Sequence, residues 1–290
     1  MTEYCLFPGC VIPNRIPFIE ASARFVFNKL GVAVSDLPFT CCPDPTGLVM
    51  ASKDSWLVLG ANNLAMAEAA GKPVLSLCNG CTQTLKAVQH ELQHHPRTMA
   101  KVNAMLEKVG KKVNGGATVR HFVDVLRNEV GVEKIKAALT RSLEGLKVAC
   151  HTGCHYARPS EVMQFDDPFE PKFLRELVAA TGATPVDYED EWLCCGNAVA
   201  NKDEETAKAL NERKFKSIVA AGADVVCVVC PACFQRLDGV QRSLKGVVAK
   251  QLPVLYLTEL FALAMGASAA DINLKMHRVK DDELVTRMGW

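Results

Sequence analysis

Ten of the thirteen cysteines in this chain fall into two sets with nearly the same spacing. The sets are Cys10, Cys41, Cys42, Cys78 and Cys81, and then Cys154, Cys194, Cys195, Cys230 and Cys233. The second set follows the first by 144, 153, 152 and 152 residues at its four landmarks. A nearly constant offset indicates an internal duplication. We therefore predict two similar halves, residues 1–145 and 146–290.

The sequence around the cysteines repeats as well. An apolar run ends in a Gly-Cys turn at 4–10 and again at 148–154, and each Cys-x-x-Cys follows a short apolar run typical of a buried strand. Helical patterns precede these runs at 54–70 and 203–221, and follow them at 82–92 and 234–244. The alternation predicts an α/β fold with a parallel sheet in each half. The cysteine loops would then lie at the carboxyl ends of strands, where open α/β sheets bind ligands.

Two segments lie outside the repeat. Residues 94–146 carry helical patterns broken by glycines, and we expect them to form a helical connection between the halves. Residues 270–290 are polar with scattered apolar residues. We expect this tail to pack on the body of the protein.

Composition and charge exclude several classes of protein. The 33 basic and 32 acidic residues leave a net charge of +1, without the cationic excess that nucleic acid or an anionic membrane surface attracts. The first ten residues lack a secretory pattern, and the most apolar late stretch, 252–265, is too short to span a bilayer. We expect a cytoplasmic protein with no membrane span and no nucleic-acid partner. No glycine-rich nucleotide motif joins a strand to a helix, so we expect neither flavin nor nucleotide in this chain.

The number of thiols limits the chemistry. In a reducing compartment, many cysteines in a long chain indicate metal, cluster or thiol chemistry rather than disulfides. Five thiols per half exceed the four ligands of a zinc site or an ordinary cubane cluster, although a structural zinc site could use four of them. Cys227-x-x-Cys230-x-x-Cys233 resembles the start of a ferredoxin site, but position 237 is Leu. We therefore expect Cys227, like Cys5 and Cys150, to be a buried packing residue.

The complete frame resembles a known family. Cys-x30-Cys-Cys-x35-Cys-x-x-Cys, repeated with gaps of 39 and 34 residues, is similar to the duplicated CCG domain and, within it, to the B subunit of heterodisulfide reductases. Cys41-Cys42-Pro43, Cys78-Asn79-Gly80-Cys81 and Cys194-Cys195-Gly196 carry the likeness. The gaps of 30 and 34 residues are each one residue shorter than the family pattern.

The resemblance implies an oxidoreductase that acts on a sulfur group. Each half would hold a noncubane [4Fe–4S] cluster, and a small disulfide of the coenzyme M–coenzyme B type would be cleaved homolytically between the two clusters. The implied catalytic, cofactor-binding and metal-binding residues are the five cysteines of each set, namely Cys10, Cys41, Cys42, Cys78 and Cys81, and Cys154, Cys194, Cys195, Cys230 and Cys233. The implied partners, which belong to the same complex, are the C subunit, which is ferredoxin-like, and the A subunit, which contains flavin.

Two other functions fit the same motifs. One is a related component of a sulfur-oxidising complex that handles persulfide or carrier-bound sulfur. The other is a noncatalytic electron-transfer module.

Some charged and titratable residues lie near the cysteines in the sequence. His151 or His155 could protonate a departing thiolate or form an ordinary hydrogen bond, and His155 is the candidate proton donor. Arg15 and Arg158 could hold an anionic group of the substrate, or form salt bridges at helix starts. The other histidines, which we expect at the surface, are His90, His94, His95, His121 and His277.

Overall fold

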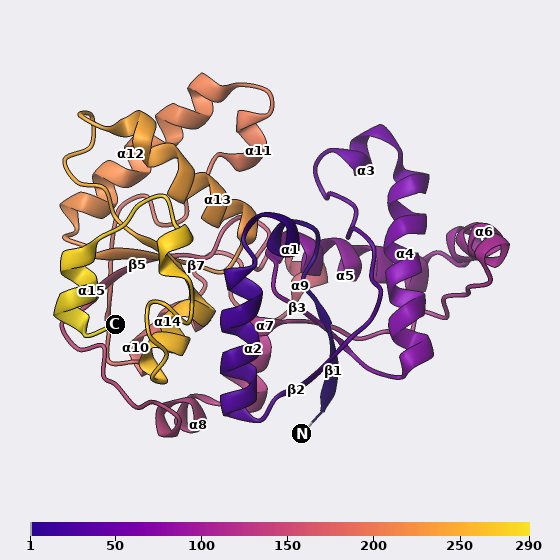
Figure 1. The fold of residues 1–290 in the computed structure, drawn as a ribbon. Coiled ribbons are helices and arrows are strands. Elements are labelled where there is room, and N and C mark those ends of the chain that lie inside the picture. Colours follow the sequence, from indigo (N-terminus) through magenta and orange to yellow (C-terminus); the bar gives the residue numbers. More distant parts are fainter. Residues whose placement is uncertain (1) are drawn as a thin grey trace.

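The computed structural model describes residues 2–290 and contains two four-stranded parallel sheets, one in each half (Figure 1). In the first sheet the strand order is β2-β1-β3-β4, formed by β1 (Glu3–Phe7), β2 (Ala33–Asp36), β3 (Val74–Ser76) and β4 (Val119–His121). In the second sheet the order is β6-β5-β7-β8, formed by β5 (Lys147–His151), β6 (Thr184–Val186), β7 (Val225–Val228) and β8 (Val254–Tyr256). The predicted α/β class and the repeated plan are confirmed.

Helices connect and cover these strands. In the first half they are α1 (Val11–Arg15), α2 (Phe18–Leu30), α3 (Leu48–Ala51), α4 (Lys53–Ala70), α5 (Asn79–His94), α6 (Pro96–Leu106), α7 (Phe122–Asp124) and α8 (Val132–Ala137), with the short turns Glu107–Val109 and Val125–Val130. In the second half they are α9 (Ser160–Met163), α10 (Phe173–Ala180), α11 (Asn197–Ala200), α12 (Glu204–Ala220), α13 (Pro231–Val240), α14 (Leu257–Ala264) and α15 (Asp282–Met288), with the turns Gln241–Leu244 and Leu274–Met276. The four helices predicted around the Cys-x-x-Cys loops correspond to α4, α5, α12 and α13.

The prediction of a purely helical connection at 94–146 is wrong in one place. Strand β4 lies inside that segment and pairs with β3, with Val74 opposite Val119. Strand β4 has only three residues and, unlike the equally short β3, no cysteine motif of the repeat follows it, so its sequence gives no separate strand signal. Parallel pairing with a buried neighbour fixes its conformation instead.

The two halves share one hydrophobic core. Helix α2 of the first half packs on α14 of the second (Figure 1), and in their contact the hydroxyls of Ser22 and Thr258 lie 2.8 Å apart and are buried. The same cluster of buried side chains contains Leu6 and Phe27 from the first half and Val148 and Leu260 from the second. Each half therefore covers apolar surface of the other.

Two of the histidines predicted at the surface are buried. His121, at the end of β4, is fully buried, and His277 is 3% exposed. The Nε2 atom of His277 lies 2.9 Å from a carboxylate oxygen of Glu259, which is also buried. Burial lowers the pKa of His277, but the charge and hydrogen bond of Glu259 outweigh it and the pKa rises.

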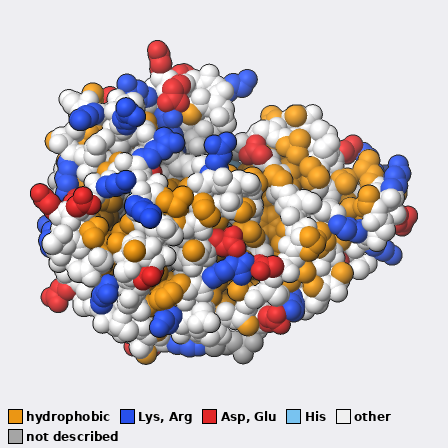
Figure 2. Space-filling view, viewed as in Figure 1, with side chains coloured by type: hydrophobic (Ala, Val, Ile, Leu, Met, Phe, Trp, Pro, Cys, Tyr) orange, Lys and Arg blue, Asp and Glu red, His pale blue; other side chains and the backbone are white. Residues whose placement is uncertain are grey.

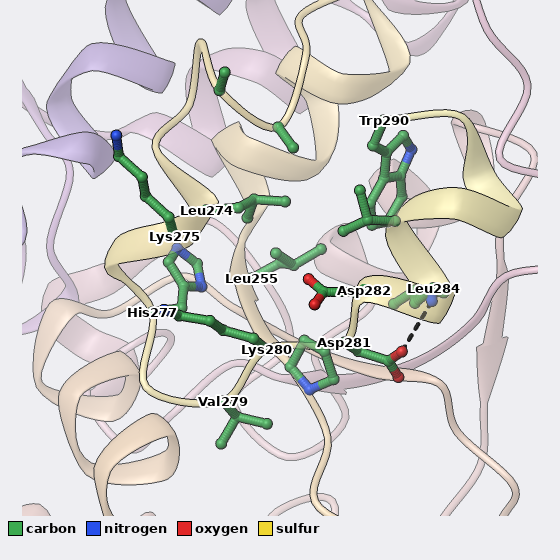
Figure 3. A pocket seen from close by; sticks show the side chains of 14 residues that line it. Leu255, Leu274, Lys275, His277, Val279, Lys280, Asp281, Asp282, Leu284 and Trp290 are labelled. Atoms are coloured by element: carbon green, nitrogen blue, oxygen red, sulfur yellow. Dashed lines mark hydrogen bonds between the residues drawn. The ribbon is translucent and has the colours of Figure 1, made fainter.

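The C-terminal residues pack on the body, as predicted. Ile272 and Leu284 are buried in the shared core, and the backbone N–H groups of Arg278 and Val279 donate to the Asp238 carboxylate of α13. Between this segment and β8 lies a cavity of about 280 Å³, lined in part by Leu255, Lys275 and Trp290 (Figure 3).

All thirteen cysteines are free thiols. Cys5, Cys150 and Cys227 lie within β1, β5 and β7 and are fully buried, as expected for packing residues. Across residues 2–290, none of the helices combines the length and the apolar character needed to cross a membrane.

Candidate metal centre

All ten cysteines of the duplicated frame line one cavity of about 340 Å³ between the two halves. Cys78 and Cys230 immediately precede α5 and α13 and have nearly the same backbone conformation, with φ of −136° and −135°. Each therefore lies at the carboxyl end of a strand and the amino end of a helix, as the sequence predicts. The space-filling view shows a notch between the halves, at the top, where the α3 and α11 regions face one another (Figure 2).

The thiols contact one another in a continuous series. The Sγ atoms of Cys42 and Cys81 are 3.0 Å apart, and the thiols of Cys78 and Cys230 interact across the boundary between the halves, which raises the pKa of Cys78. The full series of neighbouring thiols is Cys10, Cys41, Cys42, Cys81, Cys78, Cys230, Cys233, Cys195, Cys194 and Cys154. The two sets of five thus meet at their Cys-x-x-Cys loops.

Contacts between thiols shift their pKa values in opposite directions. Hydrogen bonds with Cys154 and Cys195 lower the pKa of Cys194 to about 2, whereas the hydrogen bond with Cys194 raises the pKa of Cys195 to about 12. Adjacent thiols therefore cannot all ionise without positive charge between them. Thiolates are the metal-binding form of cysteine, so a bound cationic centre would allow all of them to ionise.

The backbone approaches the sulfur atoms closely at two equivalent glycines. A Cβ atom on Gly9 would lie 2.9 Å from Cys81 Sγ, and a Cβ on Gly153 would lie 3.0 Å from Cys233 Sγ. Both glycines have positive φ, +71° and +84°, which favours glycine at these positions. A side chain at either position would occupy the space beside the sulfur atoms. The two glycines leave this space open, which fits a metal cluster bound by the cysteines.

A hydrogen bond between the halves holds one of the loops. The Asn79 side chain, between Cys78 and Cys81, donates to the backbone carbonyl of Thr152 at 2.6 Å. Thr152 precedes the Gly153-Cys154 turn. This bond joins a cysteine loop of the first half to the corresponding turn of the second, and sequence reasoning did not anticipate it.

The other predicted site residues lie at different distances from the cavity. His155 is half-buried and lines it. Arg15 and Arg158 are exposed, and neither is among the lining residues. The charge of Arg158 nevertheless acts on the thiol of Cys154.

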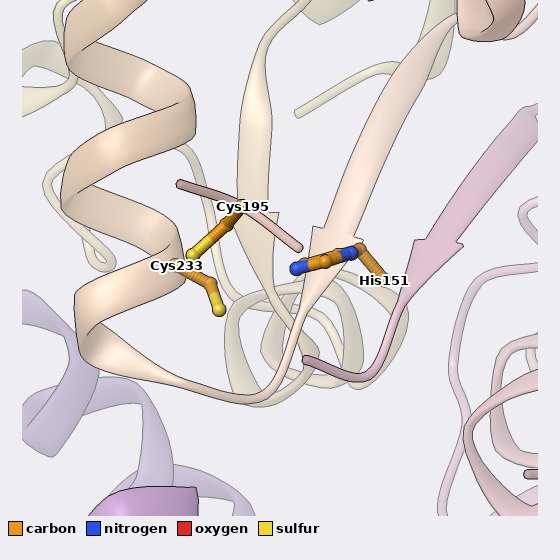
Figure 4. Close-up of side chains that lie close together, drawn as sticks. All are labelled: His151, Cys195 and Cys233. Atoms are coloured by element: carbon orange, nitrogen blue, oxygen red, sulfur yellow. The ribbon is translucent and has the colours of Figure 1, made fainter. Parts of the chain in front are cut away.

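Two further residues lie close to the second set of cysteines. One ring nitrogen of the buried His151 and the Sγ atoms of Cys195 and Cys233 all lie within 4.8 Å of one another (Figure 4). Lys214 of α12 is fully buried and donates to the backbone carbonyls of Asp190 and Glu191, just before the Cys194-Cys195 pair. Sequence reasoning did not single it out. The available signal was a lysine within the apolar stripe of the predicted helix 203–221.

A known protein family matches the chain twice, once in each half. The family CCG, a cysteine-rich domain, matches residues 4–86 and 148–238. The chain belongs to the CCG cysteine-rich family. The matches cover both Cys-Cys pairs and both Cys-x-x-Cys loops of this CCG protein.

Several relatives align over nearly the whole CCG protein. It is 35% identical to the B subunit of the ferredoxin/F420H2-dependent CoB-CoM heterodisulfide reductase of Methanosarcina acetivorans, covering 99% of this chain and 97% of that one. It is 38% identical to a heterodisulfide reductase B-subunit-like protein of Archaeoglobus profundus, covering 92% and 91%. It is 28% identical to the membrane anchor subunit of the 8-methylmenaquinol:fumarate reductase of Wolinella succinogenes, covering 99% of both chains.

A solved structure shares the fold. The CCG protein superposes on a hypothetical protein from Helicobacter pylori with a TM-score of 0.75 and 16% sequence identity. The superposition covers 97% of this chain and 52% of the other, so this chain spans about half the length of that protein.

Proposed function

We propose that this CCG protein is the catalytic iron–sulfur subunit of a heterodisulfide reductase complex. The observation that carries the proposal is the convergence of ten cysteines, five from each half, on one cavity. The identity to heterodisulfide reductase B subunits over nearly the full length supports it.

Each half would bind one noncubane [4Fe–4S] cluster through its five cysteines. The ligands are Cys10, Cys41, Cys42, Cys78 and Cys81 in one half, and Cys154, Cys194, Cys195, Cys230 and Cys233 in the other. When bound, the clusters supply one electron each to the two sulfur atoms of a disulfide. Gly9 and Gly153 leave room beside the ligands, and His155 lies at the cavity wall, where it can give a proton to a departing thiolate.

The relatives suggest the substrate and partners. Their names specify a CoB-CoM heterodisulfide, so we propose a small disulfide of this type for the present chain. The ferredoxin-like C and flavin-containing A subunits of the same complex would deliver the electrons in the cytoplasm. The two cluster-binding halves would be residues 1–145 and 146–290. Arg15 and Arg158 would hold anionic groups of the substrate.

An electron-transfer role without disulfide chemistry is the second candidate. The Wolinella relative, which is part of a fumarate reductase, aligns over the whole chain. In that role the clusters would be reduced and reoxidised without binding a thiol. The sulfur-oxidising alternative would bind persulfide in the same cavity.

Iron and acid-labile sulfide measured after anaerobic purification test the proposal, together with electron paramagnetic resonance before and after addition of coenzyme M or coenzyme B. We expect about eight irons per chain, two clusters of four, and a signal that changes with the thiol. Cys42→Ser and Cys195→Ser should each alter one cluster and abolish disulfide reduction.

Other results would contradict the proposal. Zinc in place of iron would contradict it and favour a structural role. Eight irons with a signal that no thiol changes would favour the electron-transfer module. His155→Ala should slow turnover without loss of iron, and an unchanged rate across the pH range would exclude His155 as the proton donor.

A further inference from the structure

The two halves place different residues beside equivalent cysteines. Phe7 is the last residue of β1 and pairs with Ser76, whereas His151 is the last residue of β5 and pairs with Val228. The two positions are equivalent because Ser76 and Val228 each lie two residues before the first cysteine of a Cys-x-x-Cys loop. Both ring nitrogens of His151 are buried, and neither has a hydrogen-bond partner among residues 2–290. The second half therefore directs a polar ring at its cysteines where the first half has an apolar one.

A second difference lies on the long helices. Helices α4 and α12 bury residues in the same register, with Trp56, Gly60, Asn63, Leu64 and Ala67 matching Ala207, Asn211, Lys214, Phe215 and Ile218. In this register Lys214 is the counterpart of Asn63. The Asn63 side chain donates to the backbone carbonyl of Cys41 at 3.0 Å. In the second half Asn211, one turn earlier, makes the corresponding bond to the carbonyl of Cys195 at 2.7 Å. Lys214 is therefore an additional group, which donates to the carbonyls of Asp190 and Glu191, just before the Cys194-Cys195 pair.

The charge of Lys214 is not neutralised by a dedicated carboxylate. The carboxylate of Asp190 is 2.8 Å from Arg213, and that of Glu191 is 2.9 Å from Arg175. Burial lowers the pKa of Lys214 to about 8, a shift that the charges of Cys233 and Cys195, and then of Asp190 and Glu191, oppose. The ammonium group is held by the two backbone carbonyls that lead into the Cys194-Cys195 pair.

A third difference is a negative charge beside the cysteines of the first half. Asp44 follows Cys42 by two residues, and its negative charge acts on the Cys42 thiol. The equivalent position after Cys195 is Asn197, which is neutral. Both residues line the cavity.

We propose that Lys214 and His151 make the cluster of the second half a stronger electron acceptor than the cluster of the first half. The proposal rests on the proposed function, in which each half holds a cluster. Reduction adds negative charge, which a buried cation stabilises. Hydrogen bonds to cluster sulfur and nearby charge also set the potentials of iron–sulfur clusters. With Lys214 and His151 in one half and Asn63, Phe7 and Asp44 in the other, the first electron from a donor should settle on the second-half cluster.

A potentiometric titration of the full chain, purified anaerobically and followed by electron paramagnetic resonance, tests the inference. We expect two midpoints in the wild type. Lys214→Met should lower one midpoint by at least 59 mV, a tenfold change in the one-electron equilibrium constant, and leave the other unchanged. Lys214→Arg should preserve the wild-type value, because the charge remains. His151→Phe, which introduces the residue of the first half, should lower the same midpoint.

The matched control is Lys216→Met on the same helix. Lys216 pairs with Glu212 and its side chain is 55% exposed, so the same change of charge occurs in contact with water. Neither midpoint should move. Comparison with the spectra of Cys42→Ser and Cys195→Ser identifies which cluster each midpoint belongs to.

Iron analysis separates the possible failures. A wild-type chain without iron would overturn the proposed function. Eight irons with midpoints that Lys214→Met leaves in place, or shifts equally, would overturn only the present inference. If Lys214→Met fails to fold or bind iron, His151→Phe decides, and an unchanged second-half midpoint in that variant would overturn the inference.

Discussion

At Gly153 the backbone conformation and the space beside the cysteine ligands are linked. Its φ of +84° is unfavourable for other residues, and a Cβ atom would lie 3.0 Å from Cys233 Sγ and 3.1 Å from the Asn79 amide nitrogen. The glycine therefore lets the turn approach both a cysteine of its own half and the side chain that bridges the halves.

Gly153→Ala should destabilise the fold and displace the second-half ligands. We expect a backbone cost of about 1–2 kcal/mol and, in addition, loss of about half of the bound iron. Thermal unfolding and iron analysis of the anaerobic protein measure the two effects.

The control for this prediction is Gly145→Ala. Gly145 has nearly the same φ, +83°, but an added Cβ would meet nothing within 4 Å. This variant should lose similar backbone stability and keep its iron. Equal iron content in the two variants would show that the turn does not constrain the cluster.

At the scale of elements, the contact between α2 and α14 joins the halves. The Ser22 hydroxyl donates to the carbonyl of Ile19 at 3.0 Å and lies 2.8 Å from the Thr258 hydroxyl, with both side chains buried. Ser22→Ala leaves the Thr258 hydroxyl without this partner, which should cost about 1–3 kcal/mol.

A double-mutant cycle checks this prediction. In Ser22→Ala combined with Thr258→Val, both polar groups are gone and much of the lost stability should return, because a matched apolar pair leaves no unsatisfied group. Denaturant unfolding gives the free energies. A double variant as unstable as the sum of the two single variants would show that the hydroxyls do not interact.

Some helices and strands could be predicted from the sequence pattern and others could not. The longer helices α4, α5 and α12 and the central strands β1, β3, β5 and β7 could be located from apolar periodicity and from the repeat. Strands β2, β4, β6 and β8 could not, because they lie at the sheet edges, outside the repeated cysteine motifs, and depend on pairing with a central strand. His121 and His277 were misplaced for a related reason, since their burial results from contacts with distant parts of the chain.

At the scale of the whole molecule, the halves depend on one another. Their shared core contains Phe18 and Phe27 from α2 together with Leu260 and Phe261 from α14. Separation at residue 145 would expose this surface to water. We expect residues 1–145 and 146–290 to be insoluble when produced separately and to give a soluble, iron-containing complex when produced together. A separate half that is soluble and unfolds cooperatively would contradict this expectation.

The sequence by itself determined the duplication, the α/β class and the ten cysteines, because these follow from local periodicity and from an offset repeated along the chain. Only the tertiary structure decided how the two sets of cysteines meet. The contact between Cys78 and Cys230, the bond from Asn79 to Thr152 and the shared core all join residues far apart in sequence. It also placed Lys214 and His151 beside the second set of cysteines and Asn63 and Phe7 beside the first. A repeat in the sequence predicts two similar sites, but the side chains packed around each site determine how the two differ.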